Sequence, residues 1–263
     1  MSIFKKAAQL EEQNIDFAMV SIIRAEGSTP RNVGKMIVLP DGSIFGTIGG
    51  GLAERYAIDE ALEAMKEKKS RVAYYKLNSD AKDGIKMNCG GNMDVYIEVH
   101  TPRPKIFLVG GGHVNYAVAK FANQMGYEVK VVDDREEFAN PERFPFATEV
   151  YADPDYDKCI GEVKVDEFTC VVIATKDSDE KALRAVIDSN AKYIGVIGSK
   201  RKITIVKQNL LKDGYTEERL NQLYMPIGLD IGSETPEEIA ISIIGEIMKD
   251  LSFTTGKSLK EML

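Results

Sequence analysis

The sequence holds few of the residues from which metal sites and disulfide frameworks are built. There are two histidines, His100 and His113, and three cysteines, Cys89, Cys159 and Cys170, with no C-x-x-C pair. An odd number of cysteines at such spacing argues against a disulfide framework and a thiolate zinc site. Two histidines also argue against a self-contained catalytic metal cage, so we assign no metal ligands.

Clustered positive charge and long apolar runs are lacking as well. The formal net charge is -7, which argues against general affinity for nucleic acid or anionic lipid. No apolar run approaches the roughly 20 residues that a membrane span requires. The first segment, MSIFKKAAQLEEQ, is typical of an amphipathic helix and has no small-residue cleavage site. We therefore expect a cytoplasmic protein without nucleic-acid or membrane partners, in which anion binding is local.

The hydrophobic fraction of 44% over 263 residues is normal for a globular protein with one large core or two modest ones. Residues 1–100 read as one α+β unit. Its predicted elements after the first helix are a strand at 16–23, a hairpin over 35–48, a helix over 52–68 and strands at 71–77 and 93–99. We expect TPRP at 101–104 to be a linker, because two prolines favour an extended path and interrupt a ladder.

From residue 105 the patterns of strands and helices alternate, which is typical of a doubly wound parallel sheet. The predicted strands lie at 106–109, 127–133, 170–175 and 193–198, with helices at 113–125 and 179–190. Thr235, Pro236 and Glu238 predict a capping box at the start of the last helix. The predicted fold class is α/β: an N-terminal α+β domain over residues 1–100 and a Rossmann-like domain over residues 105–263.

A glycine turn follows the first predicted strand of the second domain. Gly110, Gly112 and Asn115 occupy the three positions of G-x-G-x-x-G, where a pyrophosphate approaches the amides of a helix start. Asn115 in the third place predicts looser packing of the helix on the strand. His113, at the first helical position, meets a phosphate or merely covers the turn. Asp133, about 20 residues further on, is expected to bind a ribose hydroxyl; alternatively, the turn serves geometry alone.

A basic segment, GSKRK, follows the predicted strand at 193–198. It places Ser199, Lys200 and Arg201 at another carboxyl end of the parallel sheet, the edge where such sheets hold ligands. The alternative interpretation is a solvated basic helix start.

The first domain has glycine-rich loops of its own. Gly49, Gly50 and Gly51 precede a predicted helix, and their N–H groups are expected to be open to an oxyanion or phosphate. Arg31, in the loop after the first strand, is a natural bidentate partner for phosphate or carboxylate. Cys89, flanked by small residues, is a candidate reactive thiol. The alternatives are tight-turn geometry, an arginine in a surface contact and a cysteine that is a small buried hydrophobe.

Five separated motifs run in collinear order along nearly the whole chain. They are GSTPRNVGKMIV…GTIGGGLAE, NCGGNMDVYIE, GGGHV…VVDDR…RFP, YIGVIGSKRK and PIGLDIGSETPEEIAISIIGEI. Together they resemble the XdhC/CoxI family, the accessory factors for maturation of xanthine dehydrogenase and carbon monoxide dehydrogenase. The resemblance implies a protein that binds and shields the molybdenum cofactor (molybdopterin), supports its sulfuration by a cysteine desulfurase, and delivers it to an apo molybdenum hydroxylase of the xanthine dehydrogenase type. It implies a carrier and chaperone more than a turnover enzyme.

The family motifs carry site residues onto both domains. In the first domain the implied cofactor surface comprises Ser28, Pro30, Arg31, Gly49, Gly50, Gly51, Glu54, Cys89, Gly90 and Gly91. In the second, the implied nucleotide-like crevice comprises Gly110, Gly112, His113 and Asp133. Relatives commonly carry a histidine in the turn after the third main strand of this domain, whereas this chain reads TKDSDEKAL at 175–183. Asp177 and Ser178 cannot replace an imidazole near neutral pH, so any role of that histidine is left open.

The competing hypothesis is an NAD(P)-dependent oxidoreductase acting on a small substrate, with the cofactor in the second domain. It lacks an evident proton-transfer residue, because His100 sits beside the linker and no Tyr-x-x-x-Lys pair occurs in a suitable context. We assign no catalytic residue. We also expect a homodimer, since Rossmann-like units often bury an edge or a helix.

Overall fold

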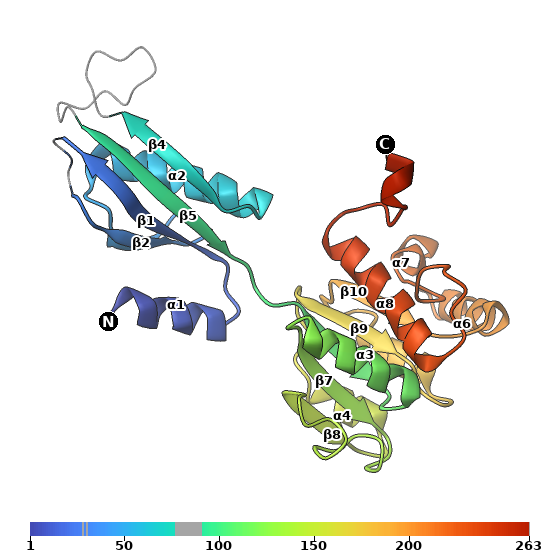
Figure 1. The fold of residues 1–263 in the computed structure, drawn as a ribbon. Coiled ribbons are helices and arrows are strands. Elements are labelled where there is room, and N and C mark those ends of the chain that lie inside the picture. The colour runs from blue at the N-terminus through green and yellow to red at the C-terminus, as the bar shows by residue number, and fades with distance from the viewer. Residues whose placement is uncertain (28, 30, 77–90, 263) are drawn as a thin grey trace. The chain divides into compact units, whose positions relative to one another are not determined.

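The computed structural model describes residues 1–27, 29, 31–76 and 91–262. The chain divides into two compact units, Met1–Pro102 and Arg103–Leu263 (Figure 1). Four predicted site residues, Ser28, Pro30, Cys89 and Gly90, lie outside the described residues.

The first unit is a five-stranded antiparallel sheet with a helix on each face. Its elements are α1 (Ile3–Glu12), β1 (Phe17–Glu26), β2 (Lys35–Val38), β3 (Ile44–Thr47), α2 (Gly51–Glu67), β4 (Arg71–Lys76) and β5 (Asn92–His100). The strand order is β3-β2-β1-β5-β4.

The two helices of this unit cover different parts of the sheet. Four alanines spaced by one helical turn, Ala53, Ala57, Ala61 and Ala64, let α2 approach closely, and their cluster includes buried side chains of β1, β2 and β5. On the opposite face α1 packs Leu10 in a smaller cluster.

The second unit is a parallel sheet in the order β10-β9-β6-β7-β8. Its strands are β6 (Lys105–Val109), β7 (Glu128–Asp133), β8 (Glu149–Ala152), β9 (Thr169–Ile173) and β10 (Tyr193–Val196). Its helices are α3 (His113–Gln124), α4 (Tyr156–Gly161), α5 (Asp179–Val186), α6 (Lys200–Lys212), α7 (Glu217–Asn221), α8 (Pro236–Leu251) and the 3-10 helix η1 (Leu259–Met262). The first strand of the unit is central and the direction of winding changes between β6 and β9, as in Rossmann folds.

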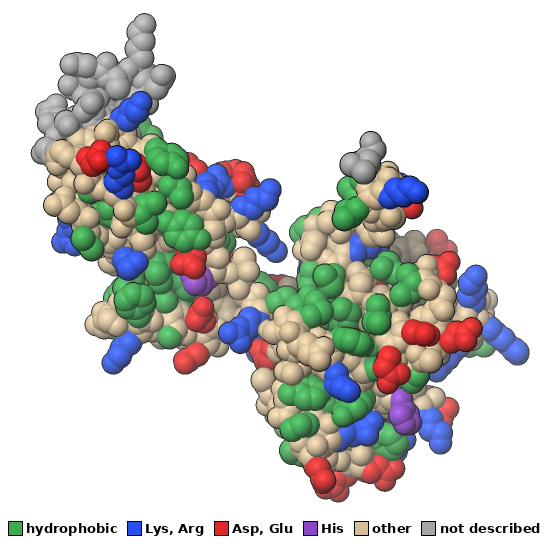
Figure 2. All heavy atoms as spheres, viewed as in Figure 1, with side chains coloured by type: hydrophobic (Ala, Val, Ile, Leu, Met, Phe, Trp, Pro, Cys, Tyr) green, Lys and Arg blue, Asp and Glu red, His purple; other side chains and the backbone are tan. Residues whose placement is uncertain are grey.

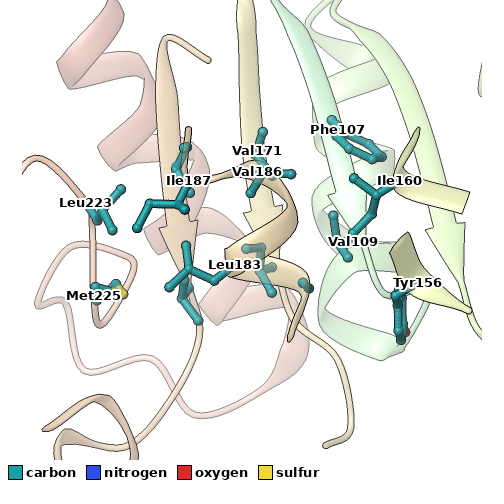
Figure 3. Close-up of a cluster of buried hydrophobic side chains, with 14 of the residues drawn as sticks. Phe107, Val109, Tyr156, Ile160, Val171, Leu183, Val186, Ile187, Leu223 and Met225 are labelled. Carbon is teal, nitrogen blue, oxygen red and sulfur yellow. The ribbon is translucent and has the colours of Figure 1, made fainter. Parts of the chain in front are cut away.

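Each face of this sheet has a core of its own. The helices α3 and α8 pack on one face. On the other face Phe107, Val171 and Leu183 belong to a cluster that also includes residues of α4, α6 and α7 (Figure 3). The predicted fold class, an α+β unit followed by a doubly wound parallel sheet, is therefore confirmed.

The ends of several elements follow signals in the sequence. The predicted capping box of α8 is present: the Glu238 amide donates to Thr235 Oγ1 at 3.3 Å, and the Thr235 amide donates to Glu238 Oε2 at 3.0 Å. The helix predicted over 179–190 is shorter and ends at Val186. Within the described ranges, no helix is both long and apolar enough to span a bilayer.

Candidate functional site

The glycine turn between β6 and α3 has a different reason for each of its glycines. Gly110 has φ of +102°, and a Cβ there would lie 2.4 Å from the carbonyl oxygen of Ala174. A Cβ at Gly111 would lie 1.9 Å from the carbonyl oxygen of Phe138. Space remains open at Gly112, the residue that precedes α3. Two glycines are thus required by close packing of the chain on itself, and the third leaves room.

The third position of the fingerprint binds the helix to the sheet. Asn115 is fully buried, and its Nδ2 donates to the carbonyl oxygens of Val109 at 3.2 Å, Gly110 at 2.7 Å and Val172 at 3.4 Å. Val109 is the last residue of β6 and Gly110 follows it, whereas Val172 lies in β9. The Asn115 amide thus makes hydrogen bonds to the sheet that a glycine cannot make. The looser packing expected for an asparagine at this place stays a prediction.

Asp133, the last residue of β7, is used within the protein. Its side chain is fully buried; Oδ2 accepts from the Gly111 amide at 2.7 Å, and Oδ1 accepts from the Arg135 amide and Nε, both at 3.0 Å. The hydrogen bond to Asp133 raises the pKa of the Arg135 guanidinium. The expected contact with a ribose hydroxyl is therefore corrected: in this structure Asp133 has no exposed surface for a ligand, and it holds the glycine turn instead.

Two arginines after β7, stacked on aromatic rings, cover the same turn. Arg143 Nε donates to the carbonyl oxygen of Gly111 at 3.3 Å, and its guanidinium carbon lies 4.6 Å from the centre of the Tyr116 ring. The guanidinium carbon of Arg135 lies 3.8 Å from the centre of the Phe138 ring. Stacking of this kind holds both arginines in place. Gly111 is thereby enclosed, whereas His113 at the first position of α3 is exposed.

A cavity of about 420 Å³ opens at the carboxyl ends of β7 and β8. Two of its lining residues are acidic, Asp134 and Glu136; the others are Ala139, Asn140, Pro141, Val150, Ala152 and Pro154. Carboxylates in the lining repel phosphate groups. The cavity gives no support to nucleotide binding.

The ends of β9 and β10 carry a network that the sequence analysis missed. The Thr175 amide and Oγ1 donate to Asp179 Oδ1 at 2.7 and 2.5 Å, and Lys202 Nζ forms an ion pair with Asp179 Oδ2. Ser199 caps α6, since its Oγ accepts from the Lys202 amide at 3.3 Å. Lys200 stands exposed at the first position of α6. The Thr-x-x-x-Asp spacing in TKDSD was the available signal for this network.

One end of the first sheet brings the N-terminal motif segments together. Glu26, at the end of β1, pairs with Asn92 at the start of β5, next to Gly91. Lys35, at the start of β2, pairs with Thr47 at the end of β3. The loop after β1, the triple-glycine loop and Gly91 therefore lie at the same end of the sheet.

The triple-glycine loop holds a carboxylate of its own. Gly49, Gly50 and Gly51 have φ of 128°, 78° and 71°. Glu54 Oε2 accepts from the Ile48 amide at 3.0 Å and from the Gly50 amide at 3.2 Å. The loop conformation, which favours glycine, directs these amides at a side chain of the following helix.

Thr47 completes this arrangement. Its Oγ1 donates to Glu54 Oε2 and accepts from the Gly49 amide at 3.0 Å. Burial raises the pKa of Glu54, but the hydrogen bonds from Thr47, Ile48, Gly50 and Gly49 outweigh it and leave the pKa below its ordinary value. The prediction that the amides of this loop are open is wrong for Gly49 and Gly50.

Arg31 is a cation in the loop between β1 and β2, at this end of the sheet. It is exposed, and its guanidinium makes no ion pair with any residue in the described ranges. Its loop is shaped by Thr29 Oγ1, which donates to the Arg31 carbonyl oxygen at 3.2 Å and to Asn32 Oδ1 at 3.0 Å. The same loop reaches the glycine loop at Gly34, where a Cβ would lie 2.9 Å from the Thr47 carbonyl oxygen.

The cysteines and acidic residues that the structure describes form no reactive or metal site. Cys159 and Cys170 are buried, and burial raises the pKa of both thiols, that of Cys170 to about 12. Both are therefore neutral near pH 7 and poor nucleophiles. Within the described part of the chain, no group of three or more histidine, cysteine, aspartate or glutamate side chains could hold a metal ion.

Fold and site together define a two-unit protein in which an antiparallel sheet with a glycine loop is followed by a Rossmann unit with a self-occupied glycine turn. Residues 106–247 match the XdhC Rossmann domain, and residues 10–76 match the XdhC and CoxI family. The chain belongs to the XdhC/CoxI family, and the resemblance noted in the sequence is confirmed.

Three relatives are similar to the chain in sequence. It is 41% identical to the uncharacterized protein YqeB of Escherichia coli, over 95% of this chain and 46% of YqeB. It is 30% identical to a probable subunit of xanthine dehydrogenase from Bacillus subtilis, over 59% of this chain and 46% of that protein. It is 24% identical to the E. coli molybdenum cofactor insertion chaperone PaoD, over 87% of this chain and 81% of PaoD. The chain thus spans less than half the length of the first two.

A solved structure shares the fold. The crystal structure of a xanthine dehydrogenase from Bacillus halodurans superposes with a TM-score of 0.52 at 21% identity, over 97% of each chain. At this identity the likeness shows the fold alone.

Proposed function

We propose that the chain binds the molybdenum cofactor and serves the maturation of a molybdenum hydroxylase of the xanthine dehydrogenase type. The observation that carries this proposal is the similarity to a molybdenum cofactor insertion chaperone, PaoD, across most of both chains. The similarity to a probable xanthine dehydrogenase component supports the class of client. Protection of the cofactor, support for its sulfuration by a cysteine desulfurase, and delivery to the apo-enzyme are parts of the same proposal.

The geometry narrows the groups that would touch the cofactor. The cofactor carries a phosphate, and Arg31 is an exposed guanidinium in the loop that meets the end of β3 at Gly34. Gly49 and Gly50 already donate to Thr47 and Glu54, so we assign these residues to the support of the loop. A thiol contact would fall to Cys89, since the other two cysteines are buried.

In the second unit, the open position at Gly112 and the exposed His113 are the proposed contacts, with Ser199 and Lys200 at the same sheet edge. The structure does not support the NAD(P) alternative, because the Asp133 carboxylate already accepts hydrogen bonds from Gly111 and Arg135. We propose that the chain acts as a non-catalytic carrier and as a homodimer.

Retention of the cofactor through gel filtration tests the proposal. Wild-type protein mixed with molybdenum cofactor should elute with molybdenum and pterin, and Arg31→Ala should retain several-fold less, because the phosphate loses a charged partner. Lys66→Ala is the matched control, since Lys66 is an exposed cation whose partner is Glu63 on the same helix. No retention by wild type contradicts cofactor binding. Equal retention by wild type and Arg31→Ala removes Arg31 from the site.

A further inference from the structure

In the described part of the chain the two sheets have four edge strands, and three of them are protected. The outer side of β10 is occupied by the chain itself: the Tyr224 amide donates to Ile194, and the Val196 amide donates to Tyr224, both at 3.0 Å. The strand β3 is four residues long and contains Gly46 at φ of +90°. The strand β8 is also four residues long and begins at Glu149. Short strands, glycine and charge all discourage pairing with another chain.

The fourth edge, β4, is longer than β3 and β8 and is charged only at its two ends, Arg71 and Lys76. It runs for six residues, RVAYYK, without glycine or proline. Its inner side pairs with β5, and no described strand pairs with its outer side. A row of free backbone donors and acceptors on such an edge is a template for another strand.

An apolar surface adjoins this open edge. Ala73 and Tyr75 pack toward the core under α2, whereas Val72 and Tyr74 lie on the opposite face, 38% and 74% exposed. Tyr96 of β5 lies beside Val72 on that face. Figure 2 shows hydrophobic side chains at the surface of this unit among the charged ones. Because α1 packs over β2 and β3, it leaves the β4 side of this face uncovered.

We propose that β4 pairs antiparallel with β4 of a second copy of this chain, about a two-fold axis at Ala73. The two five-stranded sheets would then form one continuous sheet, with both α2 helices on the same side. Residues that lie directly opposite each other on paired strands point to the same face of the sheet. A residue on the α2 face therefore cannot be paired with one on the opposite face. Pairing about Ala73 places Val72 opposite Tyr74 of the second copy, twice. Aromatic and β-branched residues are favourable cross-strand partners.

Charge favours this register over pairing about Tyr74. Pairing about Ala73 brings Lys76 opposite Ser70 of the second copy. Glu98 of β5 lies beside Ser70. The Ser70 Oγ accepts a hydrogen bond from the Val99 amide at 3.0 Å. Glu98 and Lys76 share the uncovered face, by the register that pairs Val72 with Tyr96. Pairing about Tyr74 would instead set Val72 against the ammonium of Lys76. Exposed ion pairs contribute little energy but favour one register.

Light scattering of the full chain tests the dimer, and its readout is mass, so it is independent of the cofactor. Wild type should be a dimer at micromolar concentration. Tyr74→Lys should raise the dimer Kd by roughly tenfold or more, because the lost cross-strand pair occurs twice. Tyr56→Lys, at a 49% exposed tyrosine of α2, should leave the Kd unchanged. Circular dichroism confirms that both variants are folded. A monomeric wild type, or a Tyr74→Lys Kd equal to that of wild type, overturns the proposal.

Single cysteines test the register. In a Cys89→Ser background the remaining native thiols, Cys159 and Cys170, are buried. Under mild oxidation Ala73→Cys should form a disulfide-linked dimer, because residues on the axis face each other at distances that a disulfide spans. Val72→Cys and Tyr74→Cys should remain uncrosslinked. Crosslinking at either of these two in place of residue 73 overturns the assigned register.

Discussion

The two glycine-rich helix starts of this protein look alike in sequence and differ in how they are filled. Each holds a carboxylate of the chain itself: Glu54 in the first unit and Asp133 in the second. Glu54 reaches back from the following helix and keeps partial exposure, whereas Asp133 comes from a neighbouring strand and has none. Glycines before a helix therefore indicate an anion site, and the anion can be a side chain of the protein.

The largest effect is expected at the buried carboxylate. Asp133→Ala removes the acceptor of the buried Gly111 amide and the main partner of the Arg135 guanidinium, so we expect a loss of about 3 kcal/mol in the free energy of unfolding. Urea denaturation measures it. Asp134→Ala is the control, since that side chain is 38% exposed, and it should cost less than about 1 kcal/mol. Similar losses for both variants would show that Asp133 does not hold the turn.

The next effect separates the glycines of the turn. Gly110→Ala forces a Cβ against the Ala174 carbonyl at a positive φ, and should cost about 2 kcal/mol or more. Gly112→Ala meets open space at φ of -66° and should change stability by less than about 1 kcal/mol. Thermal unfolding of the pair decides the matter: equal costs would contradict the assignment of Gly112 as the open position.

A smaller effect is expected at the first glycine loop, and it depends on pH. The pKa of Glu54 is lowered in the folded protein, so its contribution to stability is present above the ordinary value of 4.5 and is lost as pH falls through the folded pKa. Glu54→Gln should cost about 1–2 kcal/mol at pH 7. The difference from wild type should shrink when unfolding is measured below pH 4.5. A difference that stays constant across this range would rule out a charged Glu54 as the group that fills the loop.

Much of the fold could be predicted from the sequence, because it rests on local signals. The capping box at Thr235 and Glu238, and the alternation of apolar strands and helices after residue 105, are readable without a structure. The occupants of the two glycine loops could not be predicted in the same way. Asp133 lies 22 residues from the amide of Gly111, and nothing in its neighbourhood distinguishes a ribose-binding carboxylate from one that binds the turn.

The candidate site could be predicted as a location and only partly as a chemistry. Strand pairing brings the loop of Arg31, the triple-glycine loop and Gly91 to one end of the sheet, as their shared family motifs suggested. The spacing of residues in the sequence does not predict that Glu54 accepts hydrogen bonds from the amides of Gly50 and Ile48, because such contacts depend on the backbone path of the loop.

Transfer of the cofactor is the measurement that tests the central claim most directly. The chain, loaded with molybdenum cofactor and freed of excess by gel filtration, is mixed with an apo molybdenum hydroxylase of the xanthine dehydrogenase type, and recovered hydroxylase activity is compared with that from an equal amount of free cofactor. The account predicts greater recovery from the loaded chain. Recovery no greater than with free cofactor would contradict it.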